Sequence, residues 1–142
     1  MNNALQREVA GTTVHVVGSD YWMARLPPNA EAPPCFFTSA DAHERTVLDR
    51  NWVRDLPDVL SAEGPFALLQ FRLASPFGEP GFIGHIGQAL GDANISVLVV
   101  STFTYDYALV PDADVENADR ALQAAGFPSL VDDRPRGPRE VG

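Results

Sequence analysis

The chain has 142 residues, a length that suits one domain or two very small ones built around a shared core. Its hydrophobic fraction of 45% and charged fraction of 20% are those of a globular protein and exclude wholesale disorder. The formal net charge of −9 disfavours contact with phosphate backbones and anionic bilayers, so we predict neither nucleic-acid nor membrane binding. All ten basic residues are arginines, which excludes Schiff-base lysine chemistry and a P-loop lysine.

The cysteine content and the N-terminal residues indicate a cytoplasmic protein. A single cysteine, Cys35, excludes an internal disulfide and a cysteine-rich metal site. The first residues contain no apolar leader, and no apolar run approaches the roughly 20 residues that span a bilayer. A reducing compartment is the expected setting.

The first half of the chain favours short strands. We predict a flexible polar arm over residues 1–12, followed by a hairpin over 13–26 with its turn at Gly18-Ser19-Asp20. Further short strands are predicted at 35–39 and 44–48, joined by a tight turn, and residues 55–62 are expected to form a loop or a single helical turn.

The second half carries stronger periodicity. Residues 66–73 alternate as a strand, and a breaker-rich loop follows over 74–81. Residues 81–93 place their apolar side chains on one helical face. A strand is predicted over 95–101, with Val97 and Val99 in the core and residues 105–110 as its antiparallel partner. A second helix begins near Asp112 or Asp114 and ends at Gly126, and an edge strand is expected at 129–131.

This order of elements, β-α-β-β-α-β, predicts an α+β protein with a ferredoxin-like split βαβ sandwich. We expect two halves, residues 13–64 and 65–131, of which the first is a degenerate copy packed on the second because about 60 residues bury too small a core alone. Residues 132–142 have no apolar cluster and are expected to form a disordered tail.

The common signatures of catalysis and of cofactor binding are absent from the sequence, which has no GxGxxG, P-loop, HExxH, CxxC or GxSxG motif. We therefore predict no cofactor, no catalytic residue and no metal ligand. The segment from Asp41 to Glu44, which includes His43, is either an acid-base or metal site or a solvated polar turn, and the turn is favoured. His85 is interpreted as a surface histidine and Cys35 as an inert core thiol.

Three features have both a functional and a structural interpretation. Gly84, Gly87 and Gly91 share one stripe of the predicted helix, where they either admit another backbone or face solvent. Gly81 opens that helix, where free amides either hold a carboxylate or phosphate or belong to an ordinary turn. Asp106 lies within an apolar strand, which implies either a cationic partner or a carboxylate that caps a turn.

Two stretches of the second half carry a family resemblance: Gly81-Phe82-Ile83-Gly84, and Ser101-Thr102-Phe103-Thr104-Tyr105-Asp106-Tyr107-Ala108-Leu109-Val110. Together with Glu63-Gly64-Pro65-Phe66 and Ile95-Ser96-Val97, this pattern resembles the small ACT-domain proteins. The nearest set is the stand-alone bacterial double-ACT proteins, which are related to the CASTOR-type arginine sensors. The pattern departs from the family's at Tyr105 and Pro80, where the family has threonines.

The resemblance implies a tandem ACT-like fold and a regulatory protein without catalytic activity. It also implies an amino acid or a similar small molecule bound between the two halves, and a homodimer or a regulated protein as partner. A dimerisation or interaction module without a ligand, and a small enzyme using Asp41, His43, Glu44 or His85, are the alternatives. Carried over by position, the resemblance predicts these ligand-binding residues: Ser39, Ala40, Gly81, Phe82, Ile83, Thr102, Phe103 and Asp106.

Overall fold

The computed structural model describes residues 2–73 and 78–135, which divide into two compact units. Unit 1 comprises Met1–Gly18 with Ala67–Gly142, and unit 2 comprises Ser19–Phe66. The strands β1 (Thr13–Leu26) and β4 (Ser61–Arg72) each pass from one unit into the other. The boundaries therefore differ from the predicted division into 13–64 and 65–131, because the N-terminal residues fold with the second half of the chain.

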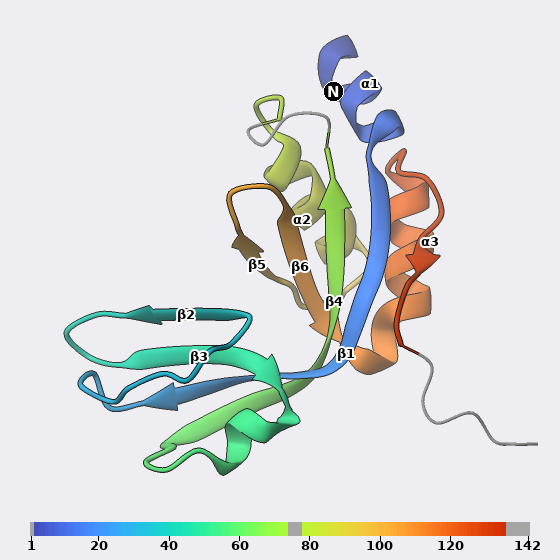
Figure 1. Ribbon diagram of the computed structural model, residues 1–142. Coiled ribbons are helices and arrows are strands. Elements are labelled where there is room, and N and C mark those ends of the chain that lie inside the picture. The colour runs from blue at the N-terminus through green and yellow to red at the C-terminus, as the bar shows by residue number, and fades with distance from the viewer. Residues whose placement is uncertain (1, 74–77, 136–142) are drawn as a thin grey trace, which may run out of the picture. The chain divides into compact units, whose positions relative to one another are not determined.

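Unit 1 is a sheet with two long helices on one face (Figure 1). Its strands follow the order β7 (Val131–Asp132), β1, β4, β6 (Asp106–Pro111) and β5 (Leu98–Ser101). Its helices are α1 (Asn3–Gly11), α2 (Phe82–Asp92) and α3 (Val115–Ala124), with a 3-10 turn, η2 (Asp112–Asp114), before α3.

The core of unit 1 lies between the sheet and this helical layer. In β4 the alternate residues Ala67, Leu69 and Phe71 face the helices, as the period of a strand requires. Phe71 packs edge-on against Phe82 of α2 and against Phe127, which follows α3. Burying such a side chain contributes about 1.5–3 kcal/mol. The other buried members of this core come from α1, β1, α2, the connection after α2, β6 and α3: Leu5, Val9, Val14, Val16, Ile86, Leu90, Ile95, Ala108, Val110, Ala118 and Leu122.

The predicted α+β class with a ferredoxin-like arrangement is confirmed, and so is the antiparallel pairing of β5 with β6. Two details differ. The place beside β4 is taken by β1, from the start of the chain, and the short β7 pairs with β1 in parallel. Val99 is 39% exposed, because β5 is the outermost strand, whereas Val97, just before β5, is half-buried and packs against the core as predicted.

Residues 3–11 are not the expected arm but the helix α1. The Asn2 side chain accepts a hydrogen bond from the Leu5 amide at 2.8 Å and so caps the helix. Leu5 and Val9, one turn apart, are buried in the core of unit 1. Leu5 and Val9 are the two buried residues of this helix, which explains why the hydrophobic pattern did not reveal it.

The expected hairpin over residues 13–26 is one continuous strand, β1. Asp20 takes a left-handed φ of 57° within the strand and does not reverse the chain. The predicted turn residues therefore distort the strand locally and do not end it. Directly after them, Tyr21 to Leu26 of β1 pair in regular antiparallel register with β3 (Arg45–Arg50).

Unit 2 is a small sheet in which β2 (Phe37–Ala40), β3, β1 and β4 are successive neighbours. Its core contains Ala24, Leu26, Val47 and Val53. All residues of this unit are described, and its helical content is the 3-10 helix η1 (Asn51–Asp55). The tandem arrangement that the resemblance implies stays a prediction.

The expected disordered tail over 132–142 falls partly outside the described residues, which end at 135. Its first residues are ordered by pairing: Asp132 belongs to β7, and the Asp133 carboxylate lies 2.7 Å from Nδ1 of His15. Arg134 donates to Asp132 and holds the pKa of that carboxyl below its ordinary value. Residues 74–77 of the predicted loop also lie outside the described residues.

Candidate functional site

The predicted site residues fall into three groups. Gly81, Phe82 and Ile83 form the start of α2, Thr102 and Phe103 lie in the turn from β5 to β6, and Asp106 begins β6. Figure 1 shows these two groups toward the same end of the sheet in unit 1, because β4 and β5 both run toward that end. Ser39 and Ala40 belong to unit 2, where they end the exposed strand β2 and pair with Thr46 and Arg45.

The turn from β5 to β6 is held by its own polar groups. The Thr102 amide donates to the Tyr105 carbonyl at 2.9 Å. The Thr102 hydroxyl is also within hydrogen-bond distance of the Tyr105 carbonyl and of the Tyr105 amide. Asp106 is half-buried and accepts a hydrogen bond from the Ser101 hydroxyl. One carboxylate oxygen of Asp106, Oδ1, therefore caps the turn, as the structural interpretation expected. The other oxygen accepts no hydrogen bond from the described part of the chain.

Phe103 is the most exposed large hydrophobic residue among those described, at 87%. It lies in the turn that follows β5, and Leu98 and Val99 of that strand are 41% and 39% exposed. So exposed a side chain contributes little to the core of unit 1, and single exposed apolar residues are common on protein surfaces.

The start of α2 is less open than its sequence predicts. Gly81 has a φ of 90°, and a Cβ added to it would lie 3.5 Å from Leu5 of α1. The Phe82 amide donates to the Glu79 carbonyl at 3.2 Å, and the Phe82 side chain is buried in the core. Of the three residues, Ile83 alone presents its side chain to solvent, at 40% exposure.

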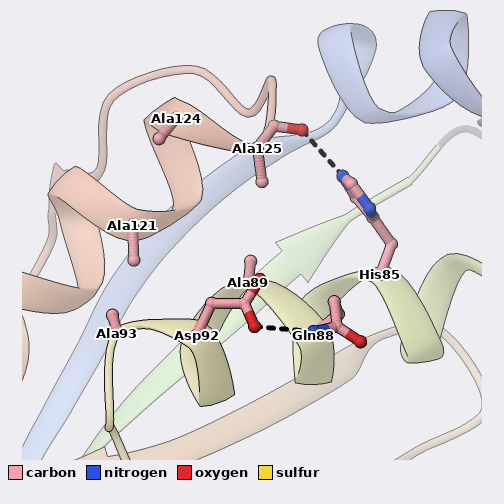
Figure 2. A pocket seen from close by; sticks show the side chains of 8 residues that line it. All are labelled: His85, Gln88, Ala89, Asp92, Ala93, Ala121, Ala124 and Ala125. Atoms are coloured by element: carbon pink, nitrogen blue, oxygen red, sulfur yellow. Dashed lines mark hydrogen bonds between the residues drawn. The ribbon is translucent and has the colours of Figure 1, made fainter.

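A second hollow lies on the helical layer of unit 1. A pocket of about 390 Å³ is lined by small side chains of α2 and α3 with three polar ones at its rim (Figure 2). His85 lies at one end and contacts the Ala125 carbonyl through Nε2 at 2.7 Å, so it joins the start of α2 to the end of α3. Gln88 and Asp92 are bonded to each other at 2.6 Å. His85 is thus a half-buried structural group and not the free surface histidine that was expected.

The other polar clusters are consistent with structural roles. Asp41 accepts from the amides of His43 and Glu44, at 2.8 and 3.0 Å, and these bonds hold the pKa of its carboxyl below the ordinary value. The favoured interpretation of this segment as a polar turn is confirmed.

Within residues 2–73 and 78–135 no three His, Cys, Asp or Glu side chains are grouped so as to hold a metal ion. In the same residues, none of the helices combines the length and the apolar character that crossing a bilayer requires.

Sequence reasoning missed α1 as a neighbour of the site. Asn2 in a capping position, with Leu5 and Val9 at a spacing of four, was the available indication of a helix.

Comparisons with known proteins agree with the fold. Residues 61–124 match the ACT domain family model, a segment from β4 to the end of α3. A protein of unknown function from Vibrio cholerae has a TM-score of 0.72 at 15% identity, over 87% of this chain and 96% of its own. A protein from Agrobacterium tumefaciens has a TM-score of 0.70 at 26% identity, over 90% and 98%.

The regulatory subunit of aspartate kinase from Thermus thermophilus, in its ligand-free form, has a TM-score of 0.56 at 10% identity, over 79% of this chain and 96% of its own. No curated protein matches the sequence.

Proposed function

We propose that this chain is a non-catalytic regulatory protein of the ACT type that binds a small molecule, an amino acid, in unit 1. The observation that carries the proposal is the ACT match over residues 61–124, which contains six of the eight predicted ligand residues. The similarity to an aspartate kinase regulatory subunit supports a regulatory role. Ser39 and Ala40, which belong to unit 2, stay predictions of the family resemblance alone.

The chemistry of the β5–β6 turn suits the cationic end of such a ligand. An amino acid needs an acceptor for its ammonium group and donors for its carboxylate. Asp106 supplies a half-buried negative charge with an oxygen not bonded to the described part of the chain. Phe103 and Ile83 supply exposed apolar surface for the ligand's side chain.

For regulation, the ligand must bind one conformation of the protein more tightly than another, since a ligand with equal affinity for both shifts nothing. Strand β5 is the element that could report this change, because it is the outermost strand and directly precedes the proposed site.

A thermal-shift screen with the twenty amino acids tests this function. A ligand at about 100 times its Kd stabilises the folded state by about 2.7 kcal/mol. For this chain length 1 kcal/mol shifts Tm by roughly 2–8 °C, so a bound amino acid raises Tm by several degrees. A Ser39→Ala variant that retains the full shift would remove Ser39 from the site. If none of the twenty raises Tm, the proposal of an amino-acid ligand is wrong.

The exposed edge of unit 1 supports a second candidate, a homodimerisation module without a ligand. Leu98, Val99 and Phe103 place exposed apolar groups on and beside the outermost strand, and uncovered strand edges readily pair with other chains. Sedimentation of the wild type and of Phe103→Ser separates the two candidates. The homodimerisation module is favoured if the wild type is a dimer, Phe103→Ser dissociates that dimer, and no amino acid raises Tm.

A further inference from the structure

The segment that follows α3 lies along the edge of β1 in unit 1. Its strand, β7, is two residues long and pairs in parallel with His15 and Val16 of β1. Both residues of β7 are exposed, with Val131 at 44%, so the strand buries little apolar surface. Directly after it, the Asp133 amide donates a hydrogen bond to the Val16 carbonyl at 2.9 Å. Polar contacts therefore hold this segment on β1.

Among the described residues, two basic side chains contact the Asp133 carboxylate. Nδ1 of His15 lies 2.7 Å from its Oδ2, and Nη2 of Arg72, in β4, lies 3.5 Å from the same oxygen. The charge of an imidazole ordinarily changes between pH 5 and 8, whereas a guanidinium stays charged throughout that range. Asp133 therefore has one partner of constant charge and one, the closer of the two, whose charge depends on pH.

The surroundings of His15 accommodate both protonation states of its ring. The side chain is 11% exposed, so water screens its charge only in part. Nε2 lies 3.1 Å from the Thr13 hydroxyl, which can accept from a protonated ring or donate to a neutral one. Nδ1 can donate to Asp133 in both states, but only the protonated ring adds the attraction of opposite charges. Loss of the proton thus weakens the contact with Asp133 without removing it.

We propose that Val131, Asp132 and Asp133 form a pH-sensitive strap on the edge of β1, which His15 holds more firmly when its ring is protonated than when it is neutral. While Asp133 is charged, protonated His15 keeps the strap on β1. When His15 has lost its proton, a neutral hydrogen bond and the more distant Arg72 remain, and the strap leaves the edge more often.

The strap controls how far the edge of β1 is exposed, and uncovered strand edges offer their backbone groups to other chains. This device is separate from the proposed ligand site, because β7 and β5 are at opposite ends of the strand order in unit 1. A failure of the amino-acid screen therefore leaves the strap untouched, and a failure of the strap leaves the proposed function untouched.

The test measures how well the Asp133 amide is protected from exchange with water, because this amide binds β1 directly. Exchange in the full-length ¹⁵N-labelled protein is measured by NMR at about pH 5.5 and about pH 8, on either side of the ordinary histidine range. Each rate is expressed as a protection factor, which is the intrinsic rate of an unstructured chain at the same pH divided by the measured rate. The amide of Leu122, buried in α3, is the reference for unfolding of unit 1.

Two variants remove the switch in different ways. His15→Asn keeps a donor near the position of Nδ1 but cannot take up a proton. Asp133→Asn keeps the shape and an acceptor and loses the charge. Because the Asp133 side chain is 41% exposed, this second variant leaves the core intact and covers the case in which His15→Asn does not fold. The matched control is Asp132→Asn, which removes the same charge one residue earlier, where the carboxylate binds Arg134.

We expect the protection factor of the amide of residue 133 to fall at least about threefold from the lower to the higher pH in wild type and in Asp132→Asn. In His15→Asn and Asp133→Asn it should be the same at both pH values. An unchanged factor in wild type, an equal fall in Asp133→Asn, or a parallel fall at Leu122 would each overturn the strap.

Discussion

The Ser101 hydroxyl donates a hydrogen bond to the Asp106 carboxylate, with 2.6 Å between Oγ and Oδ1, and the two residues are register partners of β5 and β6. The pair closes the turn that carries Thr102 and Phe103. One carboxylate oxygen therefore serves the fold, and the other is the one that the proposed function assigns to a ligand cation.

We predict that Asp106→Asn abolishes most of the thermal shift caused by an amino acid and changes the ligand-free stability by no more than about 0.5–1.5 kcal/mol. The asparagine oxygen can still accept from Ser101, but the negative charge is lost. Ser101→Ala is the complementary control, because it removes the hydrogen bond between Ser101 and Asp106 and keeps the carboxylate. A ligand shift that disappears equally in both variants would mean that turn geometry, not charge, supports binding.

Two glycines of the same helix should respond in opposite directions to alanine. Gly81 has a φ of 90°, so Gly81→Ala is expected to lower the free energy of unfolding by roughly 1–2 kcal/mol. Gly84 lies inside α2, and a Cβ there meets nothing within 4 Å, so Gly84→Ala should raise it by up to about 1 kcal/mol. Urea unfolding of both variants measures the difference. A destabilised Gly84→Ala would indicate that the glycine stripe packs against a partner.

The buried amide of Gln70 should make Tyr107→Phe costly. Nε2 of Gln70 donates to the Tyr107 hydroxyl at 2.9 Å, and both side chains are less than a tenth exposed. Removal of the hydroxyl takes the acceptor from a buried donor, which costs about 1–3 kcal/mol. Tyr105→Phe removes a hydroxyl from the neighbouring ring and is expected to cost much less. Equal denaturation midpoints for the two variants would contradict this account.

The thiol of Cys35 should react slowly with iodoacetamide at pH 7.5. Burial, and next the nearby Asp49 carboxylate, raise the pKa of this thiol above its ordinary value. Less thiolate is then present at neutral pH, and the rate of alkylation should increase as the pH rises. Asp49→Asn should increase the rate at pH 7.5, because it removes the charge and keeps an acceptor for the Phe36 amide. If the folded protein is alkylated at pH 7.5 as fast as the protein unfolded in urea, the raised pKa of the Cys35 thiol is wrong.

The candidate site was only partly accessible from the sequence. The local pattern placed Gly81 at the start of a helix, and Asp106 in a strand that pairs with the strand before Thr102, because caps and apolar strands depend on neighbouring residues. It did not show that Leu5 and Glu8 cover the start of α2, because that contact joins segments about 70 residues apart. It also did not show that the Phe82 side chain packs against Phe71, and the place of Phe82 in the ligand site stays a prediction.

The sequence by itself determined the elements from β4 to α3 and the α+β class, because the strong periods of the helices and the apolar strands are local properties of the chain. Only the tertiary structure decided that β1 lies beside β4, that Asp20 bends a strand without ending it, and that α1 forms at all. Pairing between distant strands and the burial of two apolar residues of a short helix gain their stability from long-range contacts. No local pattern records those contacts.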